Sequence, residues 1–338
     1  MKDRAISAAY RLGWTGVRRM PERWMMWLFT QIADIIWRRQ GRGVQQLEAN
    51  LHRVRPDATG KELRALSRAA MRSYLRYFLE AFRLPDIPAD ELVARMHSGG
   101  SENPALEMLK RGRGVIFALP HMGNFDTAGK WIIARGSGRF TTVNERLKPE
   151  SLYDQFVAYR ESLGFELLPH TGAGAFGVMA RRLREGRLVC LVADRDLTAG
   201  GVEVDFFGER ARVASSPAGL AVQTGAALIP VTTWFEGGDW GAQVSPEVPV
   251  PAEGTRKEKV AAMTQQLVAV WEKGIAAHPE DWHMLQKVFV ADLDRDRLPA
   301  SQSAAPGLPG GAGAGNGQRD SGHGGDTGAG RDAETPAS

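Results

Sequence analysis

Gly114-Val-Ile-Phe-Ala-Leu-Pro-His-Met-Gly-Asn-Phe-Asp126 is the stretch that decides the fold of this chain. Its first six residues form an apolar run of strand length that ends at a proline. A helix is predicted directly after it, over residues 127–134. The stretch therefore predicts a buried strand that delivers the imidazole of His121 at its carboxyl end, where open α/β sheets bind their ligands.

Strands and helices alternate on the C-terminal side of this stretch. The apolar patterns predict strands over 140–143, 165–168, 188–193 and 227–234, and helices over 150–163, 178–185, 218–224 and 256–277. Ser216 and Pro217 are typical of a helix N-cap and first helical residue. This alternation predicts an α/β fold, a central sheet with helices on its faces, whose chemistry lies where strands end.

Three parts are expected along the chain. Residues 1–110 show apolar residues at helical spacing and are interrupted by Pro85 and Pro88, so they predict a helical N-terminal region. Residues 111–298 are expected to form the α/β core. Residues 299–338 are rich in Gly and Ala and too poor in apolar residues to offset the entropy of ordering, which predicts a disordered tail.

Charge and aromatic residues concentrate at the N-terminus. The 338 residues carry a formal net charge of +4, but residues 1–55 hold eleven Lys and Arg against four Asp and Glu. Aromatic residues lie among these arginines, at Trp14, Trp24, Trp27, Phe29 and Trp37. This mixture suits an anionic bilayer surface, with nucleic acid as the competing partner and a helix packed on the domain as the structural alternative.

The apolar stretch over residues 24–37 is not expected to span a bilayer. Gln31 and Asp34 interrupt it, and it is shorter than the roughly 20 residues that a bilayer core requires. We therefore expect a membrane-interfacial segment. The single cysteine excludes an internal disulfide framework and fits a reducing compartment.

His121 and Asp126 are the candidate chemical centre. Gly123 permits a tight turn that would fold Asp126 back onto the imidazole. A histidine held by a carboxylate can take the proton from a hydroxyl as that oxygen attacks a carbonyl carbon, which contributes about 10² to 10⁴ in rate. From the spacing alone, a structural hydrogen bond is the more common interpretation of such a His–Asp pair.

The segment His121-Met-Gly-Asn-Phe-Asp126 resembles the first motif of the bacterial lipid A acyltransferase superfamily, His-x-Gly-Asn-x-Asp/Glu after a strand. Four further segments extend the likeness, at residues 143–149, 193–197, 204–208 and 279–287. Within the superfamily the chain most resembles the actinobacterial phosphatidylinositol mannoside acyltransferases. Arg195 stands where lipid A members tend to have glutamine, which favours the inositol-lipid branch over the alternative, a lauroyl or myristoyl transferase acting on lipid A.

This resemblance implies a lysophospholipid-acyltransferase-like fold, with a central mixed sheet flanked by helices and a helical N-terminal region. It implies transfer of a fatty acyl group, palmitoyl by expectation, from acyl-CoA to a mannose hydroxyl of phosphatidylinositol mannoside. His121 would be the general base and Asp126 its partner. The enzyme would be peripheral at the cytoplasmic face of an anionic membrane, with acyl-CoA as co-substrate and no cofactor.

Residues at other strand and helix ends are expected to bind substrate: Asn124, Glu145, Arg160, Asp194, Arg195 and Asp196. Glu145 could bind sugar hydroxyls and Arg160 a phosphate, although mutual salt bridges are the structural alternative. The sequence leaves open which of Asp194 and Asp196 matters. His283 is expected to be a packed histidine.

Two other functions compete with acyl transfer. The loop Gly172-Ala-Gly-Ala-Phe-Gly177 matches the dinucleotide-binding pattern Gly-x-Gly-x-x-Gly, which would suit an NAD(P)-dependent oxidoreductase. A non-catalytic lipid-binding protein that uses the basic N-terminus is the other. No Gly-x-Ser-x-Gly motif is present, and the seven histidines lack metal-ligand spacing, so no metal site is predicted.

Overall fold

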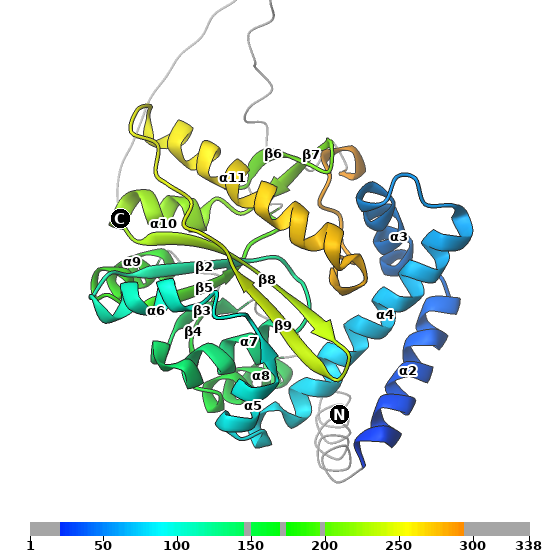
Figure 1. The fold of residues 1–338 in the computed structure, drawn as a ribbon. Helices are drawn as coiled ribbons and strands as arrows, with labels where there is room; N and C mark the ends of the chain where they lie inside the picture. Colours follow the sequence, from blue (N-terminus) through cyan, green and yellow to red (C-terminus); the bar gives the residue numbers. More distant parts are fainter. Residues whose placement is uncertain (1–20, 145–149, 170–173, 197–199, 294–338) are drawn as a thin grey trace, which may run out of the picture. The chain divides into compact units, whose positions relative to one another are not determined.

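The central sheet of the computed structural model has seven strands in the order β1-β9-β8-β2-β5-β3-β4 (Figure 1). Neighbouring strands run parallel except β8 and β9, which are antiparallel. The sheet is therefore mixed, as the resemblance implies. Its strands are β1 Met96–His97, β2 Val115–Leu119, β3 Thr141–Asn144, β4 Glu166–Pro169, β5 Leu188–Val192, β8 Ala227–Glu236 and β9 Asp239–Val244. The structure describes residues 21–144, 150–169, 174–196 and 200–293.

Helices cover both faces of the sheet (Figure 1). They are α2 Glu22–Arg38, α3 Arg42–Val54, α4 Gly60–Arg83, α5 Ala89–Arg95, α6 Asn103–Lys110, α7 Phe125–Ile132, α8 Glu150–Ser162, α9 Ala175–Arg184, α10 Ser216–Thr224 and α11 Arg256–Ala277. A separate antiparallel hairpin is formed by β6 Val202–Phe206 and β7 Glu209–Val213. Short 3-10 turns follow α4 and α11 as η1 Leu84–Asp86 and η3 Pro279–Asp281, and η4 Val290–Asp292 lies further on.

Alternation along β2 divides the core into two clusters. Ile116 and Ala118 pack in one cluster with residues of α9, α10 and α11. Val115, Phe117 and Leu119 pack in the other with residues of α5, α6 and α7. Because helices cover both faces, all five residues of β2 are buried, and the strand is a continuous apolar run.

Most elements of the α/β part lie where the sequence predicts them. The predicted helix 256–277 matches α11, whose N-cap Thr255 forms a capping box with Glu258. Helix α10 starts one residue earlier than expected, with Ser215 as its N-cap. The hairpin β6–β7 and strand β9 were not predicted, because short two-sided strands lack a long apolar run.

The N-terminal helices end at the predicted prolines. Helix α4 ends at Arg83, and Pro85 and Pro88 precede α5. Within the described ranges, no helix combines the length and apolar character needed to cross a bilayer. The boundary expected near residue 110 stays a prediction, and residues 299–338 lie outside the described part of the chain.

Candidate active site

His121 lies beside Asp194 because β2 and β5 are parallel neighbours. The register pairs Leu119 of β2 with Val192 of β5. His121 and Asp194 each lie two residues beyond this pair. The imidazole Nδ1 lies 2.5 Å from Asp194 Oδ1, and the His121 backbone N–H donates to Oδ2 at 3.0 Å. The His121 side chain is 39% exposed, whereas Asp194 is fully buried. Nδ1 therefore faces a buried carboxylate, and Nε2 is left for a substrate.

Asp194 stays ionised in this buried position. Burial by itself would raise its pKa, but the charge of His121 and hydrogen bonds from His121 and Trp282 hold the pKa below its ordinary value. The Trp282 indole Nε1–H donates to Asp194 Oδ2 at 2.9 Å. A carboxylate at Nδ1 fixes the tautomer that has its lone pair on Nε2, which is the form that accepts a proton.

The predicted pairing of Asp126 with His121 is wrong. Asp126 lies at the start of α7, and its carboxylate binds the guanidinium of Arg160 at 2.9 Å and the hydroxyl of Tyr77 at 3.0 Å. All three residues are at most 9% exposed. Helix α7 directs the Asp126 side chain toward α4 and α8, whereas the ring of His121 faces β5. Asp126 therefore cannot be the carboxylate that holds the imidazole.

Arg160 is enclosed by aromatic rings as well as by Asp126. Its guanidinium carbon lies 4.6 Å from the ring centroid of Phe156 and 5.7 Å from that of Phe125. Arg160 thus forms a salt bridge with Asp126, which was the structural alternative to substrate binding. Binding of a substrate phosphate by Arg160 stays a prediction.

The other expected substrate-binding residues fall into three groups. Asn124 is 2% exposed and caps α7: its Oδ1 accepts from Thr127 N–H at 3.0 Å, and its Nδ2 donates to Glu80 at 2.7 Å. Arg195 and Asp196 follow Asp194 and are both partly exposed. Glu145 lies outside the described residues. Contacts of these residues with substrate stay predictions.

Sequence reasoning missed the contribution of α4 to this region. Ser73, Tyr77 and Glu80 lie three and four residues apart, so they share one face of the helix. Glu80 accepts hydrogen bonds from Asn124 and Trp240, both at 2.7 Å. A signal was available, because polar side chains at this spacing interrupt an otherwise apolar helical stripe.

Ser73 joins α4 to the segment after α11. Its hydroxyl lies 2.6 Å from Asp281 Oδ1 and 2.8 Å from His283 Nε2. Burial raises the pKa of Asp281 to about 6, and burial together with the charge of His121 lowers the pKa of His283 to about 3. His283 is 8% exposed, so the expectation of a packed histidine is confirmed.

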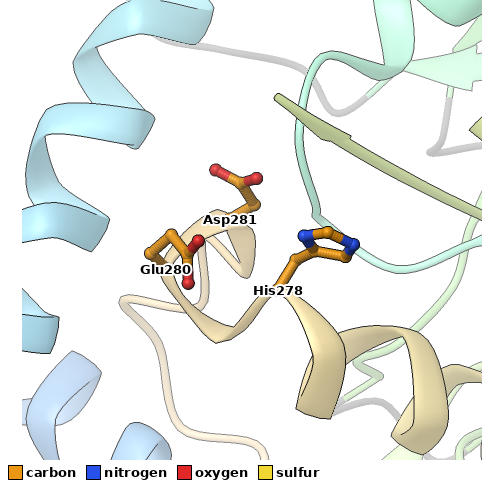
Figure 2. Close-up of side chains that lie close together, drawn as sticks. All are labelled: His278, Glu280 and Asp281. Carbon is orange, nitrogen blue, oxygen red and sulfur yellow. The ribbon is translucent and has the colours of Figure 1, made fainter. Parts of the chain in front are cut away.

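His278, Glu280 and Asp281 form a further cluster at the end of α11 (Figure 2). Their potential ligand atoms lie within 4.8 Å of one another. Both Asp281 oxygens accept hydrogen bonds, from Ser73 and from the backbone N–H of Phe235, and the ring of His278 stacks on Trp234.

The charge around this cluster opposes a cation. An open pocket of about 250 Å³ beside it is lined by Glu280 and Asp281, and also by Arg72 and Arg76. Their guanidinium groups already supply positive charge. We therefore assign the cluster a structural role.

The site as a whole is a partly exposed histidine at the end of a parallel strand, with a buried carboxylate at its Nδ1, an arrangement that suits a general base. Such a base activates a hydroxyl for attack on an acyl carbonyl. The family model described as bacterial lipid A biosynthesis acyltransferase matches residues 1–290. The chain belongs to this family, and it is an O-acyltransferase.

Close relatives carry a more specific name. A phosphatidylinositol mannoside acyltransferase of Mycolicibacterium smegmatis is 47% identical over 292 residues, 85% of this chain and 92% of that protein. Its counterpart in Mycobacterium tuberculosis is 47% identical over 297 residues, 87% of this chain and 91% of that protein. These relatives count against an oxidoreductase built on Gly172–Gly177. Residues 172 and 173 of this loop lie outside the described residues, and β4, the strand that precedes the loop in sequence, is at the edge of the sheet.

Proposed function

We propose that this enzyme transfers a fatty acyl group from acyl-CoA to a mannose hydroxyl of phosphatidylinositol mannoside, with palmitoyl as the expected acyl group. The observation that carries the proposal is the His121–Asp194 pair, because the buried carboxylate binds the imidazole at Nδ1 and leaves Nε2 for a reactant. The names of the relatives support the glycolipid acceptor. A lipid A acceptor is the alternative within the family.

In the proposed reaction, His121 Nε2 removes the proton of the acceptor hydroxyl as its oxygen attacks the thioester carbonyl. The imidazolium that forms is stabilised by Asp194, and it returns the proton to the departing thiolate. The bond from acyl carbon to sulfur breaks, and the ester bond to the sugar oxygen forms. The mechanism needs no protein nucleophile.

Membrane contact is proposed for the outer face of α2. Trp24, Trp27, Leu28 and Ile35 recur at helical spacing and are 55%, 58%, 37% and 46% exposed. Four arginines near the helix are exposed as well: Arg23, Arg38, Arg39 and Arg42. Exposed tryptophans beside arginines suit the headgroup layer of an anionic bilayer, which is where the proposed acceptor resides.

The test compares purified variants with palmitoyl-CoA and a mannosylated phosphoinositide, with products identified by mass spectrometry. We expect His121→Ala to abolish transfer and Asp194→Asn to lower kcat by about 10² to 10⁴, because both remove the general base or its orientation. His52→Ala, at an exposed histidine of α3, is the matched control. Unimpaired transfer by folded His121→Ala would refute the mechanism. Faster acylation of a lipid A precursor would refute the acceptor.

A further inference from the structure

Trp282 hydrogen-bonds to Asp194, the buried partner of His121. Its side chain is fully buried, and its indole ring packs edge-on against Phe206 with centroids 5.6 Å apart. The ring centroid of Phe207 lies 6.2 Å from that of Trp282. The hairpin β6–β7 thus contributes two aromatic rings that enclose the indole.

The chain around Trp282 is joined directly to the chain around His121. The N–H of His283 donates to the carbonyl of His121 at 2.7 Å, and the N–H of Gly123 donates to the carbonyl of Asp281 at 2.9 Å. These two bonds form an antiparallel bridge between Met122 and Trp282. The backbone of Trp282 is therefore fixed relative to the catalytic histidine.

The hydrogen bonds on Asp194 divide between its two oxygens. Oδ2 accepts from the His121 backbone N–H and from the Trp282 indole, at 3.0 and 2.9 Å. Oδ1 is left to face the imidazole Nδ1. Two donors on one oxygen restrict rotation of the carboxylate, and a fixed carboxylate in turn orients the ring that it binds.

We infer that Trp282 is a positioning residue that acts through Asp194 to orient His121. The inference rests on the proposed function for its catalytic consequence, and it assigns a role to the Asp-Trp-His segment after α11. Trp282 sets how the carboxylate is presented to the imidazole.

Replacing Trp282 with phenylalanine removes the indole donor and retains an aromatic ring. The donor helps to keep the pKa of Asp194 low, so its loss makes the carboxylate more basic. The His121–Asp194 pair then binds its proton more tightly. We expect the acidic limb of the pH profile of kcat to move upward by about half a pH unit, and kcat at neutral pH to fall about tenfold with KM little changed.

Trp271→Phe is the matched control. Trp271 is also fully buried, and its indole donates at 3.1 Å to a backbone carbonyl, that of Ala118, instead of a carboxylate. Both variants lose one buried indole hydrogen bond, so a purely structural effect should appear in both. Only Trp282→Phe should move the pH profile.

An assay without turnover separates this inference from the proposed function. Diethyl pyrocarbonate modifies neutral imidazole, and peptide mapping can follow its reaction at His121, whose side chain is partly exposed. We expect the pH midpoint of this modification to rise in Trp282→Phe and to stay at the wild-type value in Trp271→Phe. An unchanged midpoint in folded Trp282→Phe, or an equal rise in both variants, would overturn the inference. Wild-type protein that transfers no acyl group would overturn the proposed function alone.

A measurement on wild-type protein covers the case in which Trp282→Phe does not fold. The indole N–H resonance of Trp282, assigned by elimination from variants of the other tryptophans, should shift with pH at the midpoint of His121 modification. The Trp271 resonance should not shift there. A Trp282 resonance that is insensitive to pH over this range would contradict the inference.

Discussion

Asp126 and Arg160 form a buried ion pair beside the catalytic strand. The pair is 2.9 Å long, and Tyr77 supplies a second donor to the carboxylate. Two desolvated charges remain stable only when each has its partner, so removal of one leaves the other buried and uncompensated. This pair fixes α8 against α4 and α7, whatever its part in binding substrate.

We predict that Asp126→Asn lowers the free energy of unfolding by about 3–5 kcal/mol, because the guanidinium of Arg160 loses its counter-charge. Urea unfolding measures the change. Glu247→Gln, which breaks the partly exposed pair with Arg113, is the control and should cost less than about 1 kcal/mol. Equal losses in the two variants would contradict the assignment.

The turn between β2 and α7 requires glycine at position 123. Gly123 has φ +55°, and a Cβ atom there would lie 2.6 Å from the backbone of Thr233. The hydroxyl of Thr233 donates to the carbonyl of Met122 at 2.5 Å, so this strand and turn are held close together. The close approach places His121 relative to β8.

Gly123→Ala should therefore be more disruptive than Gly99→Ala. Gly99 has φ +60°, but nothing lies within 4 Å of its added Cβ, so it reports the conformational cost alone, about 1–2 kcal/mol. We expect Gly123→Ala to cost at least about 2 kcal/mol more and to reduce acyl transfer, whereas Gly99→Ala leaves transfer unchanged. Thermal unfolding and the transfer assay decide this. Equal unfolding costs would show that the contact with Thr233 can relax.

Helix α2 is apolar on two sides. Met25 and Ala33 are buried against the domain. Asp34 is buried on the same helix and accepts hydrogen bonds from Arg68 and Arg72 of α4. The opposite side exposes the tryptophans described above. Packing on the domain, one of the two alternatives that the sequence left open, is thus seen for one face of the helix, and the proposed interfacial position belongs to the other face.

Replacing Trp24 and Trp27 together with serine should weaken binding to anionic vesicles by about 10- to 100-fold, because two half-exposed indoles would no longer enter the bilayer surface. Vesicle co-sedimentation measures it. Val250→Ser, at an exposed apolar residue in a loop away from α2, is the control. High salt should weaken wild-type binding further, since the exposed arginines are screened. Binding by the double variant at the wild-type level would exclude this face.

At the scale of the whole molecule, Ser73 connects two buried groups, Asp281 and His283, whose titrations make the free energy of unfolding depend on pH in opposite directions. The folded pKa of Asp281 is raised to about 6, so its contribution is present at low pH and is lost as pH rises through 6. The folded pKa of His283 is lowered to about 3, so its contribution is present above about 6.5 and is lost as pH falls. The two effects offset each other between pH 4 and 6.

Single variants should separate these two effects. As pH falls from 6.5 to 5, the free energy of unfolding of wild type should decrease relative to His283→Asn by about 2 kcal/mol. As pH falls from 6 to 4, the free energy of unfolding of wild type should increase relative to that of Asp281→Asn. Urea unfolding at a series of pH values measures both differences. Parallel curves for all three proteins would mean that neither group titrates as described.

The sequence by itself determined most elements of the α/β part and singled out His121 as the candidate base. Apolar runs and helical spacing located β2, β5 and α11, and they placed His121 at a strand end, because these patterns reflect local backbone preferences and burial. The motif around His121 also identified the family. Local spacing failed for the carboxylate partner, since five residues along the chain suggested Asp126.

Only the tertiary structure decided which groups meet. The packing of helices on both faces makes β5 the neighbour of β2, and this adjacency brings Asp194 to His121 from 73 positions away. Trp282 arrives from a segment still further along the chain. Strand order depends on the burial of whole faces rather than on any one stretch of residues, so no local pattern encodes these contacts.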